Sequence, residues 1–195
     1  MERLAVLVGA KGRGSNMAAL LQACETGVIS AMPLCVIAPR EGTEAAGNAC
    51  GVPVEVVEPG EAYGVRLLQA LEGATVVCLA GFTRLLPQEV LAALPERVLN
   101  IHPSLLPRHG GHGMYGRRVH EAVLASGDTE SGCSVHYVTE QYDEGAVILQ
   151  GRCPVLADDT PESLAARVLA LEHRVYPEAV ELIIRQSVEQ VGVSR

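Results

Sequence analysis

Short runs of apolar residues recur along the first hundred positions, and each is followed by a segment whose apolar residues have helical spacing. Residues 4–9 form a continuous apolar run that ends in glycine, which is typical of a strand buried on both faces. In residues 15–28 the apolar side chains follow helical periodicity instead, and Ser15 is a favourable N-cap. By the same reasoning, strands are expected at 33–38, 54–57, 74–80 and 98–101, and helices at 43–50, 61–71 and 87–94.

The pattern changes after residue 101, where a long glycine-containing loop spans residues 102–115. A helix is expected at 116–125, strands at 134–138 and 146–153, and a last helix at 161–185. A polar segment separates the two strands, which predicts that they form an antiparallel pair. The last helix is expected to be bent or broken near Pro177, because proline lacks the N–H that an internal helical residue donates.

Strands that alternate with helices predict a parallel sheet with helices on both faces. We therefore expect an α/β protein with a Rossmann-like, doubly wound and mostly parallel sheet. The later strand pair adds an antiparallel C-terminal extension. Ligands of such folds bind outside the carboxyl ends of the strands, so polar side chains that follow a strand are the first candidates for a site.

Composition narrows the classes of function. The formal net charge is −8 and the basic residues are scattered, which argues against a nucleic-acid-binding surface. No apolar run approaches the roughly 18 residues of a membrane helix, and no signal-peptide pattern precedes the first strand, so we expect a cytoplasmic protein without a membrane partner. Six cysteines occur without a C-x-x-C pair, which predicts neither a disulfide framework nor a zinc site.

A glycine-rich loop, residues 9–16, joins the first predicted strand to the first predicted helix. Free N–H groups and the positive end of the helix dipole favour an anion at such a junction, and Ser15 and Asn16 can add side-chain donors. The loop lacks the Gly-Lys-Ser/Thr ending of a P-loop, and Met17 replaces the third glycine of the dinucleotide fingerprint. A small molecule that carries a phosphate therefore fits better than NAD, while an NADP site that uses Arg40 stays as a weaker alternative.

Asn100 and His102 lie on one face of the fifth predicted strand, because side chains alternate along a strand. An amide and an imidazole that point the same way at the edge of the sheet suit a developing oxyanion. Asp143, in the polar segment between the later strands, is the carboxylate available to orient the histidine and raise its pKa. Spacing does not show that Asp143 reaches His102, so a structural role for the histidine stays open.

The octapeptide Asn-Ile-His-Pro-Ser-Leu-Leu-Pro at 100–107 resembles the signature of the phosphoribosylglycinamide formyltransferases, a folate-dependent family of purine biosynthesis. Other landmarks of that family occur in the same order: Gly-Ser-Asn at 14–16, Ala-Gly-Phe-Thr-Arg-Leu-Leu at 80–86, Ser-Val-His at 134–136, Asp143, and Glu-His at 172–173. The resemblance thus covers most of the chain.

The resemblance implies transfer of a formyl group from the co-substrate 10-formyltetrahydrofolate to the amine of glycinamide ribonucleotide, without a metal. It implies that Asn100 and His102 stabilise the tetrahedral oxyanion and that Asp143 keeps His102 protonated. It assigns the ribonucleotide and its phosphate to Gly14, Ser15, Asn16 and Glu172, and the folate to Thr83, Arg84, Leu85, Leu86, Asn100, Glu140, Gln141 and Tyr142. We interpret residues 1–195 as one domain, with a phosphate-binding half at 1–100 and a folate-binding and catalytic half at 101–195.

Two features depart from the family pattern. Gly60 stands where the family often has an arginine thought to contact the folate, and Arg66 is a candidate replacement. The loop at 108–116 is longer than in some members, and we expect it to be mobile and to cover the substrate. Its His109 and His112 also suggest a metal site, but no third ligand is close in the sequence.

Three other functions compete with the transferase. A formyltetrahydrofolate hydrolase uses a similar core with water as acceptor, and usually carries an additional N-terminal regulatory domain. Formyl transfer to methionyl-tRNA is disfavoured by the acidic charge and by the lack of a C-terminal RNA-binding domain. A non-catalytic sensor of phosphorylated metabolites would not need an oxyanion donor. We expect small-molecule substrates and either a monomer or a homodimer.

Overall fold

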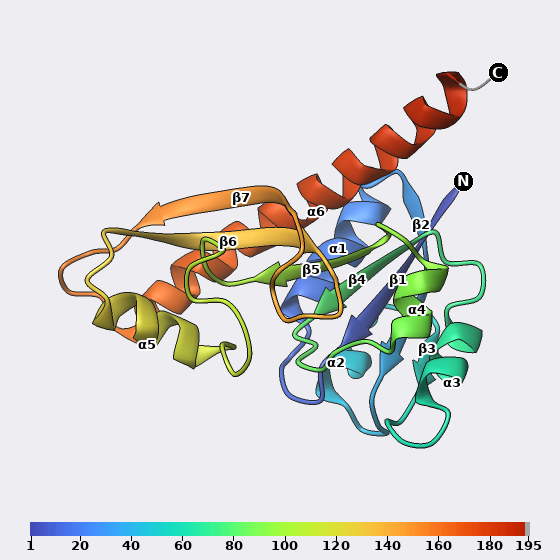
Figure 1. Ribbon diagram of the computed structural model, residues 1–195, viewed down its shortest axis with the longest axis horizontal. Helices are drawn as coiled ribbons and strands as arrows, with labels where there is room; N and C mark the ends of the chain where they lie inside the picture. The colour runs from blue at the N-terminus through green and yellow to red at the C-terminus, as the bar shows by residue number, and fades with distance from the viewer. Residues whose placement is uncertain (194–195) are drawn as a thin grey trace.

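The computed structural model describes the backbone of residues 1–193 and the side chains of residues 1–187. Within this part of the chain, seven strands form one sheet in the order β3-β2-β1-β4-β5-β6-β7 (Figure 1). The strands are β1 (Glu2–Val8), β2 (Ala31–Ala38), β3 (Val54–Val56), β4 (Val76–Ala80), β5 (Val98–His102), β6 (Glu130–Tyr137) and β7 (Val147–Pro154). The first five run parallel, and β6 is antiparallel to both β5 and β7, which confirms the predicted fold class.

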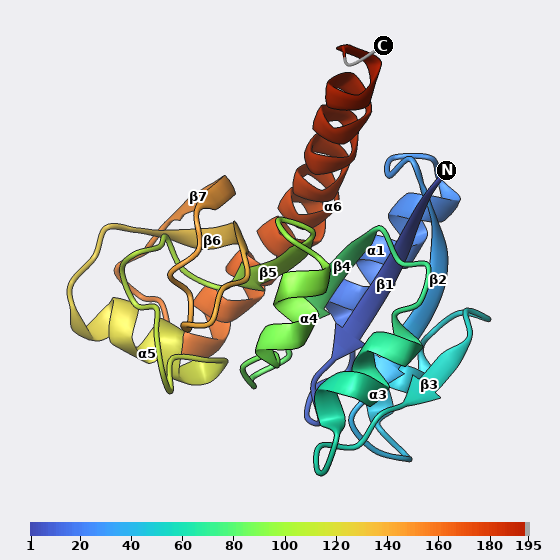
Figure 2. The same cartoon turned by 45° about the vertical axis from the view of Figure 1, so that its right-hand side comes forward.

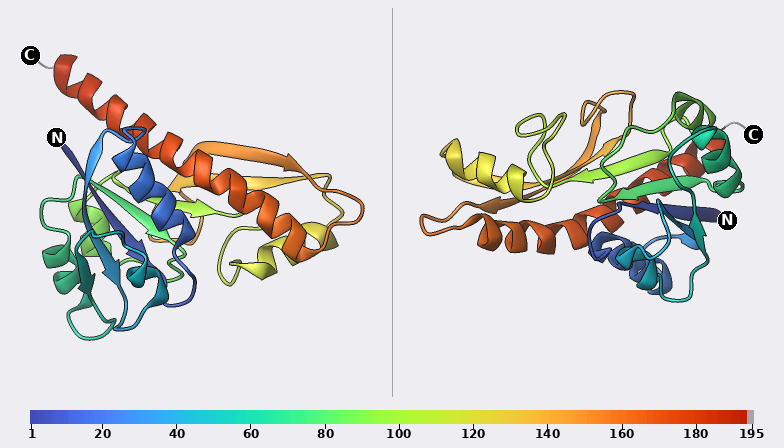
Figure 3. Two further views of the ribbon diagram at one scale, coloured as in Figure 1. Left: turned by 180° about the vertical axis from the view of Figure 1, so that it is seen from behind. Right: turned by 90° about the horizontal axis from the view of Figure 1, so that it is seen from below.

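The described helices are α1 (Ser15–Glu25), α2 (Glu44–Gly47), α3 (Tyr63–Ala70), α4 (Gln88–Ala93), α5 (Arg117–Ala125) and α6 (Pro161–Val193). Helices α1 and α6 cover one face of the sheet, and α3 and α4 cover the other (Figures 2 and 3). The alternation along β1 explains these layers. Leu4, Val6 and Val8 pack in the core under α1 and α6, whereas Ala5 and Leu7 pack in the core under α3 and α4. An unbroken apolar run is what a strand buried on both faces requires.

Helix α6 continues through Pro177, so of the two expected outcomes, a bend or a break, the break is wrong. Proline removes one backbone hydrogen bond, but the residues around it are held by packing. Tyr176 is fully buried, and its hydroxyl lies 3.0 and 2.9 Å from the carbonyl oxygens of Leu79 and Leu99. Ala179, on the other side of the proline, is fully buried as well. Neither α6 nor any other described helix is long and apolar enough to cross a membrane.

Strand β6 begins at Glu130, several residues before its predicted start. Its first residues are small or polar and therefore carry no apolar pattern. Gly132 explains why small residues occur there. A Cβ at this position would lie 1.9 Å from the carbonyl oxygen of Gly151 on β7, so only glycine allows the two strands to approach this closely.

The strand order places a ligand-binding crevice in the middle of the sheet. From β1 the chain moves to β2 on one side, and it later returns to β4 on the other side of β1. The loops that leave the carboxyl ends of β1 and β4 therefore diverge, and open α/β sheets bind ligands at this switch point. Strand β5 lies next to β4, so its last residues reach the same crevice.

Candidate active site

A cleft of about 930 Å³ opens at the carboxyl ends of β1, β4 and β5. Its wall is formed by residues 8–12, Asn16, Pro39, residues 81–84, 100–103, 111–118, His120, residues 142–143, Ala165, Leu169 and Glu172. Small-molecule sites are commonly about 300–1,000 Å³ in volume. Both the position and the size of the cleft therefore suit a substrate site.

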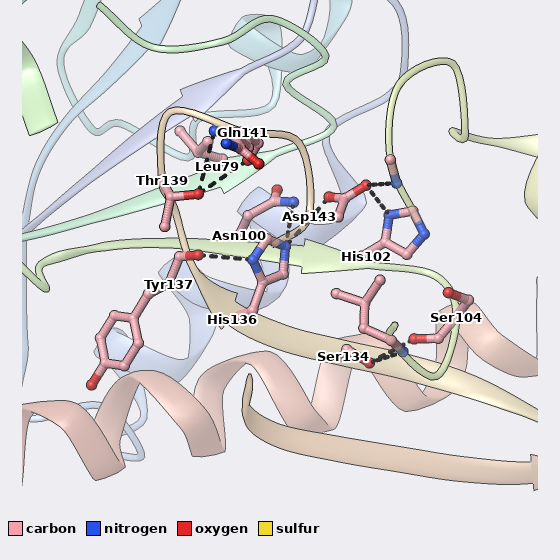
Figure 4. A network of polar contacts seen from close by, with 12 residues as sticks. Leu79, Asn100, His102, Ser104, Ser134, His136, Tyr137, Thr139, Gln141 and Asp143 are labelled. Carbon is pink, nitrogen blue, oxygen red and sulfur yellow. Dashed lines mark hydrogen bonds and ion pairs between the residues drawn. The ribbon is translucent and has the colours of Figure 1, made fainter. Parts of the chain in front are cut away.

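His102 ends β5 and is 3% exposed. Its Nε2 lies 2.8 Å from the carbonyl oxygen of His109, and its Nδ1 lies 3.4 Å from Oδ2 of Asp143 (Figure 4). A carbonyl oxygen only accepts hydrogen bonds, so Nε2 carries a proton and Nδ1 is the atom that titrates. Oδ2 of Asp143 also accepts a hydrogen bond from the N–H of Gly111 at 2.9 Å. The structure thus brings His102 and Asp143 together, which the spacing of the two residues could not show.

Asn100 lies two residues before His102 on β5, and its Nδ2 is 3.1 Å from Nε2 of His136 on the neighbouring strand β6. The other ring nitrogen of His136, Nδ1, is 2.9 Å from the carbonyl oxygen of Tyr137 and therefore carries the proton. Nε2 of His136 also lies 3.5 Å from Oδ1 of Asp143. In neutral His136 this nitrogen accepts from Asn100 (Figure 4), and in the protonated ring it donates to Asp143. The contact with Asn100 orients the amide, leaving its second N–H available to a ligand.

Burial dominates the ionisation of His102. It lowers the pKa of His102 below the ordinary 6.5, although Asp143 and the His109 carbonyl act in the opposite direction. The expectation that Asp143 gives His102 a raised pKa is therefore wrong in its net direction, because desolvation of the imidazolium outweighs the carboxylate. Burial also opposes ionisation of Asp143. The contact with Nε2 of His136, in which the protonated ring donates to the carboxylate, acts in the other direction, and with the charge of His102 and the N–H of Gly111 it holds the pKa of Asp143 below its usual 3.8.

The loop after β1 differs in one detail from its prediction. Gly14 is the N-cap of α1, with a left-handed φ of 75°, and Ser15 is the first helical residue, so the expected capping role of Ser15 is wrong. A Cβ at Gly14 would lie 2.8 Å from Cβ of Ala45, so the loop packs directly on α2. Of the residues assigned to the phosphate, Asn16 lines the cleft, whereas Gly14 and Ser15 do not form its wall.

Glu172 lines the same cleft from α6 and is 7% exposed. Its Oε2 accepts a hydrogen bond from Nδ2 of Asn16 at 2.6 Å. Burial raises the pKa of Glu172 to about 7, and the Asn16 amide opposes this shift only in part. The Oδ1 of Asn16 is buried without a hydrogen-bond partner in the described structure. Two of the four residues assigned to the ribonucleotide, Asn16 and Glu172, are therefore in contact, and Oδ1 of Asn16 is available to accept a further hydrogen bond.

Half of the residues assigned to the folate line the cleft, namely Thr83, Arg84, Asn100 and Tyr142. The other four, Leu85, Leu86, Glu140 and Gln141, are not part of its wall. Leu86 is buried in the core under α3 and α4 instead. Arg66, the candidate replacement for an arginine at position 60, donates to the carbonyl oxygen of Glu58 at 2.6 Å and also lies outside the wall.

Two histidines near the site received no role from the sequence. His136 orients Asn100, and its position opposite Asn100 on β6 appears only once the strands are paired. His120 on α5 is 5% exposed and lines the cleft. Of the suggested metal pair, His109 uses its Nε2 in a contact of 2.7 Å with Oδ2 of Asp128. In the described residues, no three His, Cys, Asp or Glu side chains are grouped as metal ligands.

Comparison with known proteins places these features in a family. Residues 2–180 match the family model described as formyl transferase. The chain is 39% identical to the chloroplastic phosphoribosylglycinamide formyltransferase of Arabidopsis thaliana, covering 96% of this chain and 67% of the relative. It is 37% identical to phosphoribosylglycinamide formyltransferase of Escherichia coli (strain K12), covering 88% and 83%. The crystal structure of glycinamide ribonucleotide transformylase 1 from Symbiobacterium toebii has a TM-score of 0.87 and 39% identity, covering 95% and 89%. The chain therefore belongs to the phosphoribosylglycinamide formyltransferase family.

Proposed function

We propose that this chain transfers the formyl group of 10-formyltetrahydrofolate to the amine of glycinamide ribonucleotide in purine biosynthesis. The observation that carries the proposal is the position of Asn100 and His102 on one face of β5, with Asp143 beside them, in the wall of the cleft. The same wall presents Asn16 and Glu172, which suit a polar ribonucleotide. The family and the names of the relatives support the same activity.

In the proposed reaction the neutral amine attacks the formyl carbon, and negative charge develops on the formyl oxygen. An N–H of Asn100 and the protonated Nδ1 of His102 donate to this oxyanion. The oxyanion adds its charge to that of Asp143, so the pKa of His102 rises in the transition state above its low resting value. His102 is therefore a cation mainly when the oxyanion is present, and its contribution is specific to the transition state.

Collapse of the tetrahedral intermediate breaks the bond between the formyl carbon and N10 of the folate. The formyl group stays on the substrate nitrogen as an amide. The proton that Nδ1 of His102 takes up from solvent as the oxyanion forms returns to solvent as the oxyanion becomes a carbonyl again, because the pKa of His102 then falls back to its low resting value. The amine loses one proton and the folate nitrogen gains one, and we propose that a water carries it. These steps need no redox change and no metal.

The rest of the proposal concerns binding. We propose that Asn16 and Glu172 hold the ribonucleotide and that Thr83, Arg84 and Tyr142 contact the folate. Each substrate then takes residues from both 1–100 and 101–195, so we propose one domain, residues 1–195, in which the two halves share both binding sites. The Oδ1 atom of Asn16 is a buried acceptor without a partner in the described structure. The pKa of Glu172 is about 7, so its carboxyl group is partly protonated at neutral pH. The pair can therefore both accept and donate hydrogen bonds. A cytoplasmic location and a monomeric or homodimeric state complete the proposal.

The test is to follow folate absorbance with 10-formyltetrahydrofolate in the presence and absence of glycinamide ribonucleotide. Deformylation that depends on the ribonucleotide supports the transferase. Equal rates with and without it would assign the chain to the hydrolases, which use water as the acceptor. A protein that binds ribonucleotide but releases no product would be the non-catalytic sensor.

A further inference from the structure

The loop that follows β5 holds both members of the His102–Asp143 pair by its backbone. The carbonyl oxygen of His109 accepts from Nε2 of His102 at 2.8 Å, and the N–H of Gly111 donates to Oδ2 of Asp143 at 2.9 Å. No side chain of the loop takes part in these two contacts. The position of the backbone therefore decides whether the pair is oriented.

The backbone at His109 has a left-handed conformation, with a φ of 55°. A residue other than glycine keeps this conformation only when its surroundings hold it, at a cost of about 1–3 kcal/mol. Asp128, in the turn between α5 and β6, supplies such a hold. Its Oδ2 lies 2.7 Å from Nε2 of His109, and its Oδ1 lies 2.6 Å from a guanidinium nitrogen of Arg108.

The two contacts of Asp128 differ in exposure: the one with His109 is sheltered from solvent, and the one with Arg108 is exposed. The side chains of Asp128 and His109 are 11% and 14% exposed, whereas that of Arg108 is 62% exposed. The hydrogen bond from His109 is the main cause of a lowered pKa of Asp128. Exposed ion pairs contribute little, so the contact with His109 is the one that anchors the loop.

We propose that Asp128 is a positioning residue for His102: by holding His109, it keeps the His109 carbonyl against Nε2 and so fixes which nitrogen of His102 carries the proton. The inference rests on the proposed function for its catalytic consequence, but the proton position itself can be measured without activity. With the carbonyl in place, Nε2 must be protonated. With the carbonyl displaced, the Asp143 carboxylate is the remaining acceptor, and the proton moves to Nδ1.

The experiment compares the wild type with Asp128→Ala and with Asp128→Asn, which keeps an acceptor but removes the charge. Long-range proton–nitrogen NMR of the full chain identifies the protonated nitrogen of neutral His102. We expect Nε2–H in the wild type and Nδ1–H in Asp128→Ala, with Asp128→Asn in between. Asp158→Asn, which removes the same charge from an exposed position, is the matched control and should keep Nε2–H.

Activity supplies the second readout. Misplacement of a catalytic group can cost on the order of 100-fold in rate, so we expect kcat to fall roughly 10- to 100-fold in Asp128→Ala, while both KM values change little. The pH at which kcat falls because His102 loses its proton should also move. The titratable groups that face His102 are Asp143, His136, His109 and His120, and Asp128 acts through one of them. A structural defect alone would lower the folded fraction without moving the proton.

The two proposals fail in different ways. If His102 stays protonated on Nε2 in a folded Asp128→Ala, or in Asp128→Asn where the alanine variant does not fold, the positioning role is overturned even if the enzyme is an active transferase. If the proton moves as expected but the wild type shows no ribonucleotide-dependent activity, the positioning role is supported and the proposed function is overturned.

Discussion

Replacing Glu172 by glutamine should change how the stability of the protein depends on pH. The carboxyl group is 7% exposed, and burial raises its pKa to about 7 from an ordinary 4.5. In the unfolded chain the group titrates near its ordinary value. Between pH 4.5 and 7 the folded protein therefore binds a proton that the unfolded chain has lost, and the free energy of unfolding falls as the pH rises through this interval. Above about pH 7 the carboxylate is charged in both states, and its burial lowers the free energy of unfolding by the full amount.

The size of the effect follows from the separation of the two pKa values. At about 1.36 kcal/mol per pH unit, the separation corresponds to about 3 kcal/mol, and we take roughly 2–3 kcal/mol as the expected range. Glutamine is neutral at every pH and keeps an oxygen that can accept from Asn16. Its NH2 group replaces the other carboxyl oxygen and can cost stability, but that cost is the same at pH 5 and at pH 8. The pH-dependent part of the difference thus isolates the buried charge.

The measurement is denaturant unfolding of the wild type and Glu172→Gln at pH 5 and pH 8. We expect the stability of the variant relative to the wild type to rise by roughly 2–3 kcal/mol between the two pH values. Glu178→Gln, at an exposed position of the same helix, is the control and should show no such change. If the difference between Glu172→Gln and the wild type is the same at both pH values, the carboxyl is not a buried group with a raised pKa, and the reasoning is refuted.

Three further predictions concern the site and its support. Asp143→Asn removes the charge that opposes the effect of burial on His102, so the pKa of His102 should fall further. As a result kcat at pH 7 should drop roughly 10²–10⁴-fold, with partial recovery at lower pH. A profile of kcat against pH with near-wild-type values would contradict the pairing. Gly14→Val places a side chain against Ala45 at a left-handed position, and steady-state kinetics should show a larger rise in KM for the ribonucleotide than for the folate. Tyr176→Phe leaves two buried carbonyl groups without their hydroxyl partner, and urea unfolding should show a loss of about 1–3 kcal/mol; an unchanged midpoint would mean that those carbonyls find another donor.

The sequence predicts the fold class well, because the signals involved are local. The apolar run of β1 and the helical spacing of α1 each report burial directly, and the order of such elements limits the possible sheets. Of the bend or break expected at Pro177, the break does not occur, for a non-local reason: Tyr176 bonds to the carbonyls of Leu79 in β4 and Leu99 in β5, which no local pattern reveals. The early start of β6 was missed because Gly132 is required by the close approach of β7 and contributes nothing to an apolar pattern.

The candidate site was predicted less completely, because its properties depend on distance and burial. Alternation along a strand placed Asn100 and His102 on one face, and the structure agrees. The contact between His102 and Asp143 joins segments that are far apart in the sequence, and so does the contact between His109 and Asp128. The predicted direction of the pKa shift at His102 was wrong, because a sequence shows a candidate carboxylate more readily than it shows how far the imidazole is desolvated.

Two carboxyl groups in the wall of one cleft, the half-buried Asp143 and the buried Glu172, have pKa values shifted in opposite directions by their surroundings. Asp143 accepts from the N–H of Gly111 and lies beside two histidines, and its pKa is lowered. Glu172 has one amide donor, from Asn16, and its pKa is raised to about 7. The negative charge is thus kept beside the imidazole, where it favours the cation that an oxyanion requires, and is reduced at the position proposed for a phosphate-bearing substrate. Because different groups titrate in the two places, the pH dependence of KM for the ribonucleotide should follow Glu172, and that of kcat should follow His102.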